Sequence, residues 1–160
     1  VLGSQMVVLA KKADSIDEAR QMLSEALHSG KALSKFREMI VNQGGDASVI
    51  DEPSNILTAQ YEVELPAKTS GVVTKLVANE LGIAAMMLGA GRKTKEEDID
   101  HAVGIKLHKK VGEAVSEGES LLTIYSNTEA IDEVIALIEA NIEIGDEGAE
   151  PPLIHDVITE

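Results

Sequence analysis

The hydrophobic period of this chain changes near residue 58, from about 3.6 residues to about 2. Before that point, apolar residues recur as they do on one face of a helix. After it, Tyr61, Val63 and Leu65 alternate with polar neighbours, as in a half-buried strand. A single element cannot satisfy both periods. The pattern therefore predicts an α+β fold, in which a helical N-terminal part precedes a small domain with a mixed or antiparallel sheet.

The N-terminal part is expected to contain three helices. The first ends by Ala13, and the second begins at the capping box Ser15-Ile-Asp-Glu18 and stops at Gly30. The third covers residues 31–43. Its apolar residues are spaced so that one face is expected to be buried, namely Leu33, Phe36 and Ile40.

We predict three segments in the chain: helices at 1–45, a linker at 46–58 and a C-terminal α+β domain at 59–160. The last is expected to hold strands at 72–77, 104–109, 114–115 and 121–125, with a closing strand at 153–158. A helix is expected from a cap at Asn79 to Leu88. A long helix should follow a cap at Asn127 or Thr128, with its apolar face running from Ile131 to Ile142.

The composition argues against several classes of function. Aromatic residues are 2% of the chain and the formal net charge is -14, so neither base stacking nor phosphate neutralisation favours nucleic acid. No cysteine is present, which removes disulfides and thiolate metal sites and fits a cytoplasmic protein. No apolar run approaches the roughly 20 residues that span a bilayer, so no membrane partner is expected.

A glycine-rich turn, Leu88-Gly-Ala-Gly-Arg92, is the main candidate site. Gly89 and Gly91 allow positive φ and close backbone approach, and Arg92 and Lys93 follow in a basic cluster of an acidic chain. Six of the 14 Lys and Arg residues lie between positions 92 and 110. The motif by itself favours a tight turn that carries solvated charges.

The sequence predicts no catalytic residue, no metal site and no cofactor site. No serine lies in a Gly-x-Ser-x-Gly elbow, and no phosphate-binding Walker loop is present. His101 and His108 are seven residues apart without a third ligand at metal-binding spacing. We expect the chain alone to be catalytically inactive.

One segment, Val111-Gly-x-x-Val-x-x-Gly-Glu-x-Leu121, resembles the turn signature of biotinyl and lipoyl carrier domains. The resemblance implies barrel-sandwich geometry with hammerhead-type turns. The carriers' modified lysine lies on a hairpin that has no counterpart here. The chemistry of a carrier is therefore not expected.

A second resemblance covers the chain in order. Residues 2–10, Leu88-Gly-Ala-Gly-Arg92, Asp98-Ile-Asp-His-Ala-Val-Gly-Ile105, the carrier-like turn and Leu153-Ile-His-Asp-Val-Ile-Thr-Glu160 together resemble the C-terminal portion of bacterial pyrimidine-nucleoside phosphorylases, of the thymidine phosphorylase family. The chain also begins with apolar residues and without an initiator Met, which predicts a fragment of a longer protein.

The resemblance implies reversible phosphorolysis of a pyrimidine nucleoside, with phosphate as co-substrate and no cofactor in this chain. The family's phosphate motif and base clamp would lie earlier in the longer protein. Residues 1–45 would belong to a larger α/β domain, and the enzyme would be a homodimer through a separate helical domain. The loop with Gly89, Gly91, Arg92 and Lys93 resembles one near the closing cleft, which makes these residues candidates for domain closure.

Three alternatives remain open at this stage. The chain could be a binding module on a carrier-like sandwich, a structural appendage of a larger domain, or part of a phosphorylase with another nucleoside substrate. The sequence does not decide between uridine and thymidine.

Overall fold

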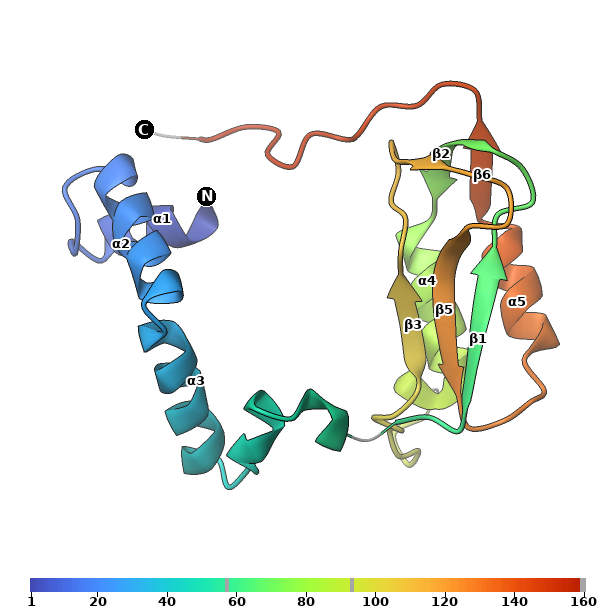
Figure 1. The fold of residues 1–160 in the computed structure, drawn as a ribbon, viewed down its shortest axis with the longest axis horizontal. Coiled ribbons are helices and arrows are strands. Elements are labelled where there is room, and N and C mark those ends of the chain that lie inside the picture. The colour runs from blue at the N-terminus through green and yellow to red at the C-terminus, as the bar shows by residue number, and fades with distance from the viewer. Residues whose placement is uncertain (57, 93, 159–160) are drawn as a thin grey trace. The chain divides into compact units, whose positions relative to one another are not determined.

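The chain forms two compact units in the computed structural model, Val1–Ile56 and Leu57–Glu160. The structure describes residues 1–56, 58–92 and 94–158. Figure 1 shows helices in the first unit, and strands with helices in the second.

The first unit contains three α-helices, α1 (Leu2–Leu9), α2 (Ile16–His28) and α3 (Lys31–Asn42). The predicted cap is confirmed, because the Ser15 hydroxyl accepts from the Glu18 backbone N–H at 3.2 Å. Gly30, between α2 and α3, has a φ of 76°. Residues 46–58, expected as a linker, include two 3-10 turns, η1 (Ala47–Ile50) and η2 (Pro53–Asn55).

The prediction that one face of the third helix is buried is wrong for this unit. Leu33 and Phe36 are 54% and 48% exposed. On α1, Leu2 and Leu9 are 73% and 80% exposed, while Ser4 is buried. The contact between α1 and α2 uses small residues instead: a Cβ added to Gly3 would lie 3.0 Å from Leu23.

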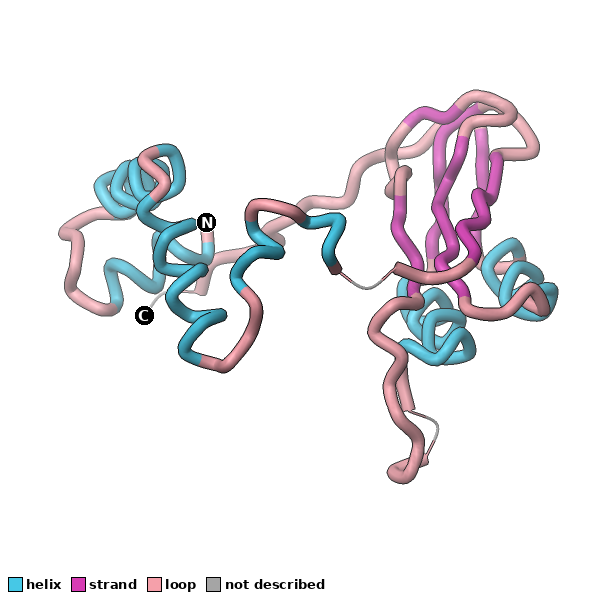
Figure 2. The backbone as a smooth tube through the Cα atoms, turned by 60° about the horizontal axis from the view of Figure 1, so that its bottom comes forward, coloured by secondary structure: helices cyan, strands magenta, loops and turns pink. Residues whose placement is uncertain are grey.

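The second unit contains two antiparallel three-stranded sheets. The first has the order β1 (Tyr61–Pro66), β5 (Ser120–Ser126), β3 (Gly104–Leu107). The second has the order β4 (Ala114–Val115), β2 (Gly71–Leu76), β6 (Ile142–Gly145). The strand predicted at Tyr61 is confirmed, since Leu65 is buried while Glu62 and Glu64 are exposed. Figure 2 shows the strands of this unit gathered together, with helices beside them.

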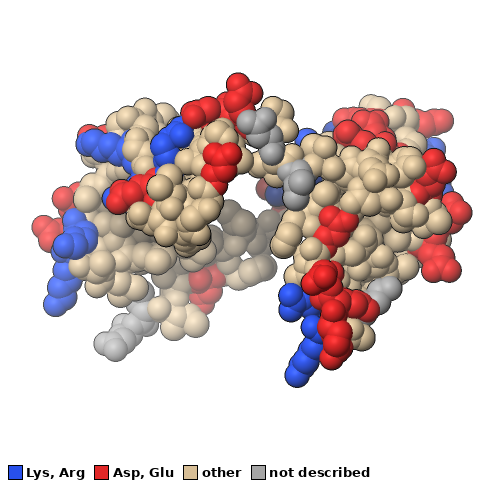
Figure 3. All heavy atoms as spheres, turned by 90° about the horizontal axis from the view of Figure 1, so that it is seen from below, with Lys and Arg blue, Asp and Glu red and all other residues tan. Residues whose placement is uncertain are grey.

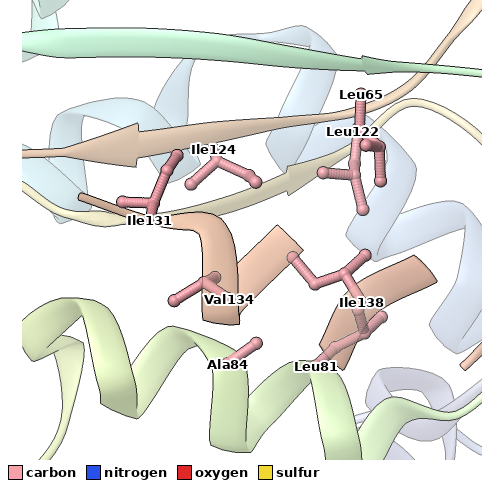
Figure 4. Close-up of a cluster of buried hydrophobic side chains, with 8 residues drawn as sticks. All are labelled: Leu65, Leu81, Ala84, Leu122, Ile124, Ile131, Val134 and Ile138. Carbon is pink, nitrogen blue, oxygen red and sulfur yellow. The ribbon is translucent and has the colours of Figure 1, made fainter. Parts of the chain in front are cut away.

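The main core joins the first sheet to helices α4 (Ala78–Ala85) and α5 (Asp132–Glu139). Leu122 and Ile124 of β5 and Ile138 of α5 are fully buried. The cluster in Figure 4 brings together aliphatic side chains from both layers, namely Leu65, Leu81, Ala84, Leu122, Ile124, Ile131, Val134 and Ile138. A smaller cluster with Val73, Val115 and Leu121 lies at the second sheet.

Several boundaries in the second unit differ from the predictions. The long helix is only eight residues, Asp132–Glu139, and Ile142 begins β6 instead. None of the predicted caps Asn79, Asn127 and Thr128 caps a helix, because α4 and α5 begin after Val77 and Ile131 without a side-chain cap. The segment 153–158, expected as a strand, has no regular structure. None of the helices within the described ranges has the length and apolarity needed to cross a membrane.

The chain after β6 packs against the turn at Gly112. Gly112 has a φ of 91°, and its N–H donates to the Val73 carbonyl at 2.8 Å. A Cβ built there would lie 2.4 Å from the Glu150 nitrogen, which is too close for any side chain. Gly118, in the next turn, has a φ of 82° and open space at the same position. The two glycines therefore share a backbone conformation but differ in their surroundings.

We predict that Gly112→Ala destabilises the second unit more than Gly118→Ala. Both changes carry the strain of positive φ, about 1–2 kcal/mol, and Gly112→Ala adds steric overlap worth about 1–3 kcal/mol. Urea denaturation of both variants measures the difference. Removing residues 149–160 should bring the Gly112→Ala loss down to that of Gly118→Ala. Equal losses in the untruncated chain would contradict this packing.

Candidate functional site

The glycine-rich turn follows directly from helix α4. The helix continues into a π-type turn, η3 (Met86–Ala90), where Gly89 has a φ of 108°. The positive φ expected at this glycine is confirmed. A Cβ there would lie 3.5 Å from the Asp100 Cβ, an ordinary contact distance, so backbone conformation rather than space favours glycine. This reversal directs the chain out of α4 into the loop that leads to β3.

Gly91 behaves differently from Gly89. Its φ is -146°, an extended conformation open to any residue, so the positive φ expected here is wrong. A Cβ at Gly91 would lie 3.2 Å from the Met86 Cγ and 3.3 Å from the Met86 Cβ. The close backbone approach predicted for this turn therefore occurs at Gly91, against Met86.

The basic residues of the loop project into solvent where they are described. Arg92 is exposed, and within residues 1–56, 58–92 and 94–158 it forms no ion pair. Lys93, the fourth candidate, lies outside the described residues. The Glu97 N–H donates to the Thr94 carbonyl at 3.4 Å, which makes a turn and no helix. Figure 2 shows this loop extending away from the strands.

The base of the loop is held by Asp100. Its N–H donates to the Gly89 carbonyl at 2.9 Å, so the two ends of the loop meet. One carboxylate oxygen accepts from the Ala102 N–H at 2.9 Å, and the other accepts from the Asn127 side-chain amide at 2.7 Å. The hydrogen bonds from Ala102 and then Asn127 lower the pKa of Asp100 below its usual value, with a smaller contribution from His101.

Asp100 and Asn127 were not predicted as site residues. The contact between the Asp100 carboxylate and the Ala102 N–H is an Asx turn. Its local signal in the sequence is an Asp that lies shortly before the strand beginning at Gly104. The Asn127 contact joins residues that are 27 positions apart. No local pattern indicates such a pair.

The histidines do not assemble with other ligands. His28 lies in the last turn of α2, where its Nδ1 is 2.7 Å from the Ser24 carbonyl oxygen. The Nε2 of His108 is 2.7 Å from the Thr123 hydroxyl, and His101 and His155 are exposed. In the part of the chain that the structure describes, no group of three His, Cys, Asp or Glu residues could hold a metal ion.

A cavity of about 170 Å³ lies away from the loop, between β1, β6 and the end of α5. Its walls combine apolar and polar residues, with Leu65, Leu121 and Ile142 among the apolar ones. Lys68 and Glu139 line it and form an ion pair at 2.8 Å. Because β1 runs from Tyr61 near the loop to Pro66 near the cavity, the two features occupy opposite ends of the strand.

The surface charge around the loop is mixed. Figure 3 shows the second unit, drawn on the right, with red acidic side chains mainly along its margins and a projecting group of blue and red side chains at its lower edge. Lys95, Glu96 and Asp98 are exposed in this loop beside Arg92. The loop can therefore offer a guanidinium and an ammonium group to an acidic or polar partner.

Residues 72–145 match the family described as the pyrimidine nucleoside phosphorylase C-terminal domain. The match begins in β2 and ends with β6, so it includes the loop, Asp100 and Asn127.

Proteins that match this chain along nearly its whole length carry the same family name. A pyrimidine-nucleoside phosphorylase of Bacillus subtilis (strain 168) is 58% identical over 159 residues, which is 99% of this chain and 37% of the relative. Proteins of the same name from Staphylococcus haemolyticus (strain JCSC1435) and Staphylococcus aureus (strain USA300) are 57% and 58% identical over the same shares. The chain thus spans 37% of the length of these relatives.

We predict that the stabilising effect of Asp100 depends on pH. Its folded pKa is lowered, so its contribution to folding is present above the unfolded pKa of about 3.9 and is lost as the pH falls further through the folded value. Asp100→Asn removes this titration. The difference in unfolding free energy between the chain and the variant should therefore shrink below about pH 4.

Urea denaturation between pH 3 and pH 7 measures this difference. Asp46 and Glu119, whose pKa values are also lowered, are present in both proteins and cancel in the comparison. A difference that stays constant with pH would contradict the role given to the Asp100 carboxylate.

Proposed function

The chain belongs to the pyrimidine-nucleoside phosphorylases, as the counterpart of their C-terminal portion, and we propose that it serves an enzyme that cleaves pyrimidine nucleosides with phosphate. The products would be the free base and a pentose 1-phosphate. The observation that carries the proposal is 58% identity over 159 residues to the Bacillus subtilis relative. Phosphate would be the co-substrate, and no cofactor is proposed for this chain.

The proposed role of these residues is structural and conformational. Attack of phosphate on the sugar requires a phosphate cradle, a clamp on the base and the exclusion of water. The loop residues offer charge, but the phosphate motif and base clamp that the family implies do not occur in this sequence. The binding groups would therefore come from the remaining length of the enzyme, while this portion would help to position them.

The exposed helices support a partner for the first unit. Leu2, Leu9 and Phe36 present large apolar surfaces to solvent. Apolar patches of this kind mark surfaces that another element covers. The proposed cover is the larger α/β domain of the same enzyme, which would itself dimerise through a separate helical domain. A cytoplasmic location is proposed with it, and the lack of cysteine is consistent with that compartment.

The loop from Gly89 to Lys95 is the proposed contact during domain closure. Three observations support this role: the loop projects from its unit, its base is tied at Asp100, and Arg92 is exposed without an ion pair in the described residues. A guanidinium on a fixed base can bind a carboxylate or phosphate in two-point geometry. Closure would bring that partner to the loop and keep water from the reaction.

We further propose that the two sheets form a barrel-sandwich of the carrier type. The supporting features are two three-stranded antiparallel sheets and turns with positive φ at Gly112 and Gly118. The proposal concerns geometry alone.

The isolated chain should release no base from uridine or thymidine in the presence of phosphate. The binding motifs that the family implies are not in its sequence. Chromatography of the free base measures the reaction. A chimaera in which this chain replaces the matching region of the Bacillus subtilis relative should regain turnover, and this is the positive control. Release by the isolated chain that survives repurification would show that the active site is wrongly placed.

In the same chimaera, Arg92→Ala should lower turnover by about tenfold or more, the expected effect of losing one charged hydrogen bond in the closed state. The melting temperature should change little, because an exposed charge contributes about 0–1 kcal/mol. Lys95→Ala, in the same loop, is the matched control for general loss of charge. A lower melting temperature with unchanged turnover per folded enzyme would contradict the closure role.

A further inference from the structure

The side-chain amide of Asn127 connects two segments that are distant in the sequence. Its Oδ1 accepts from the Gln60 backbone N–H at 2.9 Å, across 67 positions. Its Nδ2 donates to the Asp100 carboxylate at 2.7 Å, across 27 positions. The partners also fix the orientation of the amide, because an N–H requires the oxygen and a carboxylate requires the nitrogen.

The two partners of Asn127 hold different parts of the unit. Gln60 directly precedes β1, close to where the second unit begins at Leu57. Asp100 closes the base of the loop through its bond to the Gly89 carbonyl. One side chain therefore touches both the entry of the chain into this unit and the base of the loop that carries Arg92.

The backbone around Asn127 is itself well fixed. Ser126 is fully buried, donates its hydroxyl to the Thr128 carbonyl at 2.8 Å and accepts from the Thr128 N–H at 3.1 Å. Ser126 also pairs with Tyr61 at the end of β5. The backbone at Asn127 is therefore held in place at the end of β5. A shift of Gln60 or Asp100 changes the hydrogen bonds of the Asn127 side chain, because the Asn127 backbone cannot follow the movement.

We propose that Asn127 is a positioning residue that couples the chain entry at Gln60 to the orientation of the loop from Gly89 to Asp100. Movement of the entry segment changes the support that Asn127 gives to Asp100, and through Asp100 the placement of Arg92. This coupling rests on the proposed closure role of the loop. The chemistry requires an acceptor and a donor on two separate atoms of a short side chain, which asparagine supplies and ionised aspartate does not.

Asn127→Asp keeps the hydrogen bond to Gln60 and removes the one to Asp100. The new carboxylate still accepts from the Gln60 N–H, but it has no donor for Asp100 and repels its charge. Hydrogen exchange of the 160-residue chain at pH 7 should show faster exchange at the Asp100 and Ala102 amides, by about two- to tenfold, the range expected for one lost hydrogen bond. Exchange at the Gln60 amide should remain slow.

Adding Asp100→Asn to Asn127→Asp should restore the slow exchange. The reversed pair lets the new amide at position 100 donate to the carboxylate at position 127 while its oxygen still accepts from Ala102. Asn79→Asp makes the same chemical change on α4, where Asn79 donates to Glu80, and should leave the loop amides unchanged. Unchanged exchange in Asn127→Asp, or failure of the reversed pair to restore it, would overturn the coupling.

Turnover in the chimaera separates failure of this inference from failure of the closure role. If Arg92→Ala lowers turnover, Asn127→Asp should lower it severalfold and the reversed pair should recover it. A normal turnover in Asn127→Asp beside an impaired Arg92→Ala would overturn the positioning role. If neither variant affects turnover, the closure role is wrong, and the exchange measurements alone decide whether Asn127 couples the two segments.

Discussion

The second unit depends on the burial of strand β5 between two neighbouring strands and two helices. β5 pairs antiparallel with β1 on one side and β3 on the other, and Leu122 and Ile124 are fully buried against the side of α4 and α5. Burying one such side chain contributes about 1.5–3 kcal/mol. Because β5 is held on both edges and its residues 121–124 are buried on both faces, the residues at its end have a fixed position.

That fixed end is where the candidate site is built. Ser126 and Asn127 follow β5, Gln60 precedes β1, and the loop returns to β3 after Asp100. The two exposed hydrogen bonds of the Asn127 side chain, to Gln60 and to Asp100, would add little to the stability of an isolated domain. What matters is which segments they connect, since the proposed closure role needs a loop with a defined base. The structure supplies such a base, with Arg92 beyond it.

The first unit has a different physical character. The buried residues of its helices, Ser4 and Ala19, are small, a Cβ on Gly3 would lie 3.0 Å from Leu23, and larger side chains are exposed. Short helices are marginal in water unless an apolar face is covered. The relatives are longer than this chain, which spans 37% of their length. The exposed faces and this extra length are consistent with the proposal that another part of a longer protein covers these helices.

The sequence by itself determined the elements whose signals are local. The change of period placed the helices and the strand at Tyr61, Ser15 capped α2, and Gly89 reversed the chain at positive φ. The end of α5, the unstructured tail and the exposure of Leu33 and Phe36 were missed, because helix length and burial depend on which surfaces meet. The pairing of Asn127 with Asp100 and Gln60 was missed for the same reason. Hydrogen bonds across 27 and 67 positions exist only once the β5 pairing has brought those segments to one end of the sheet.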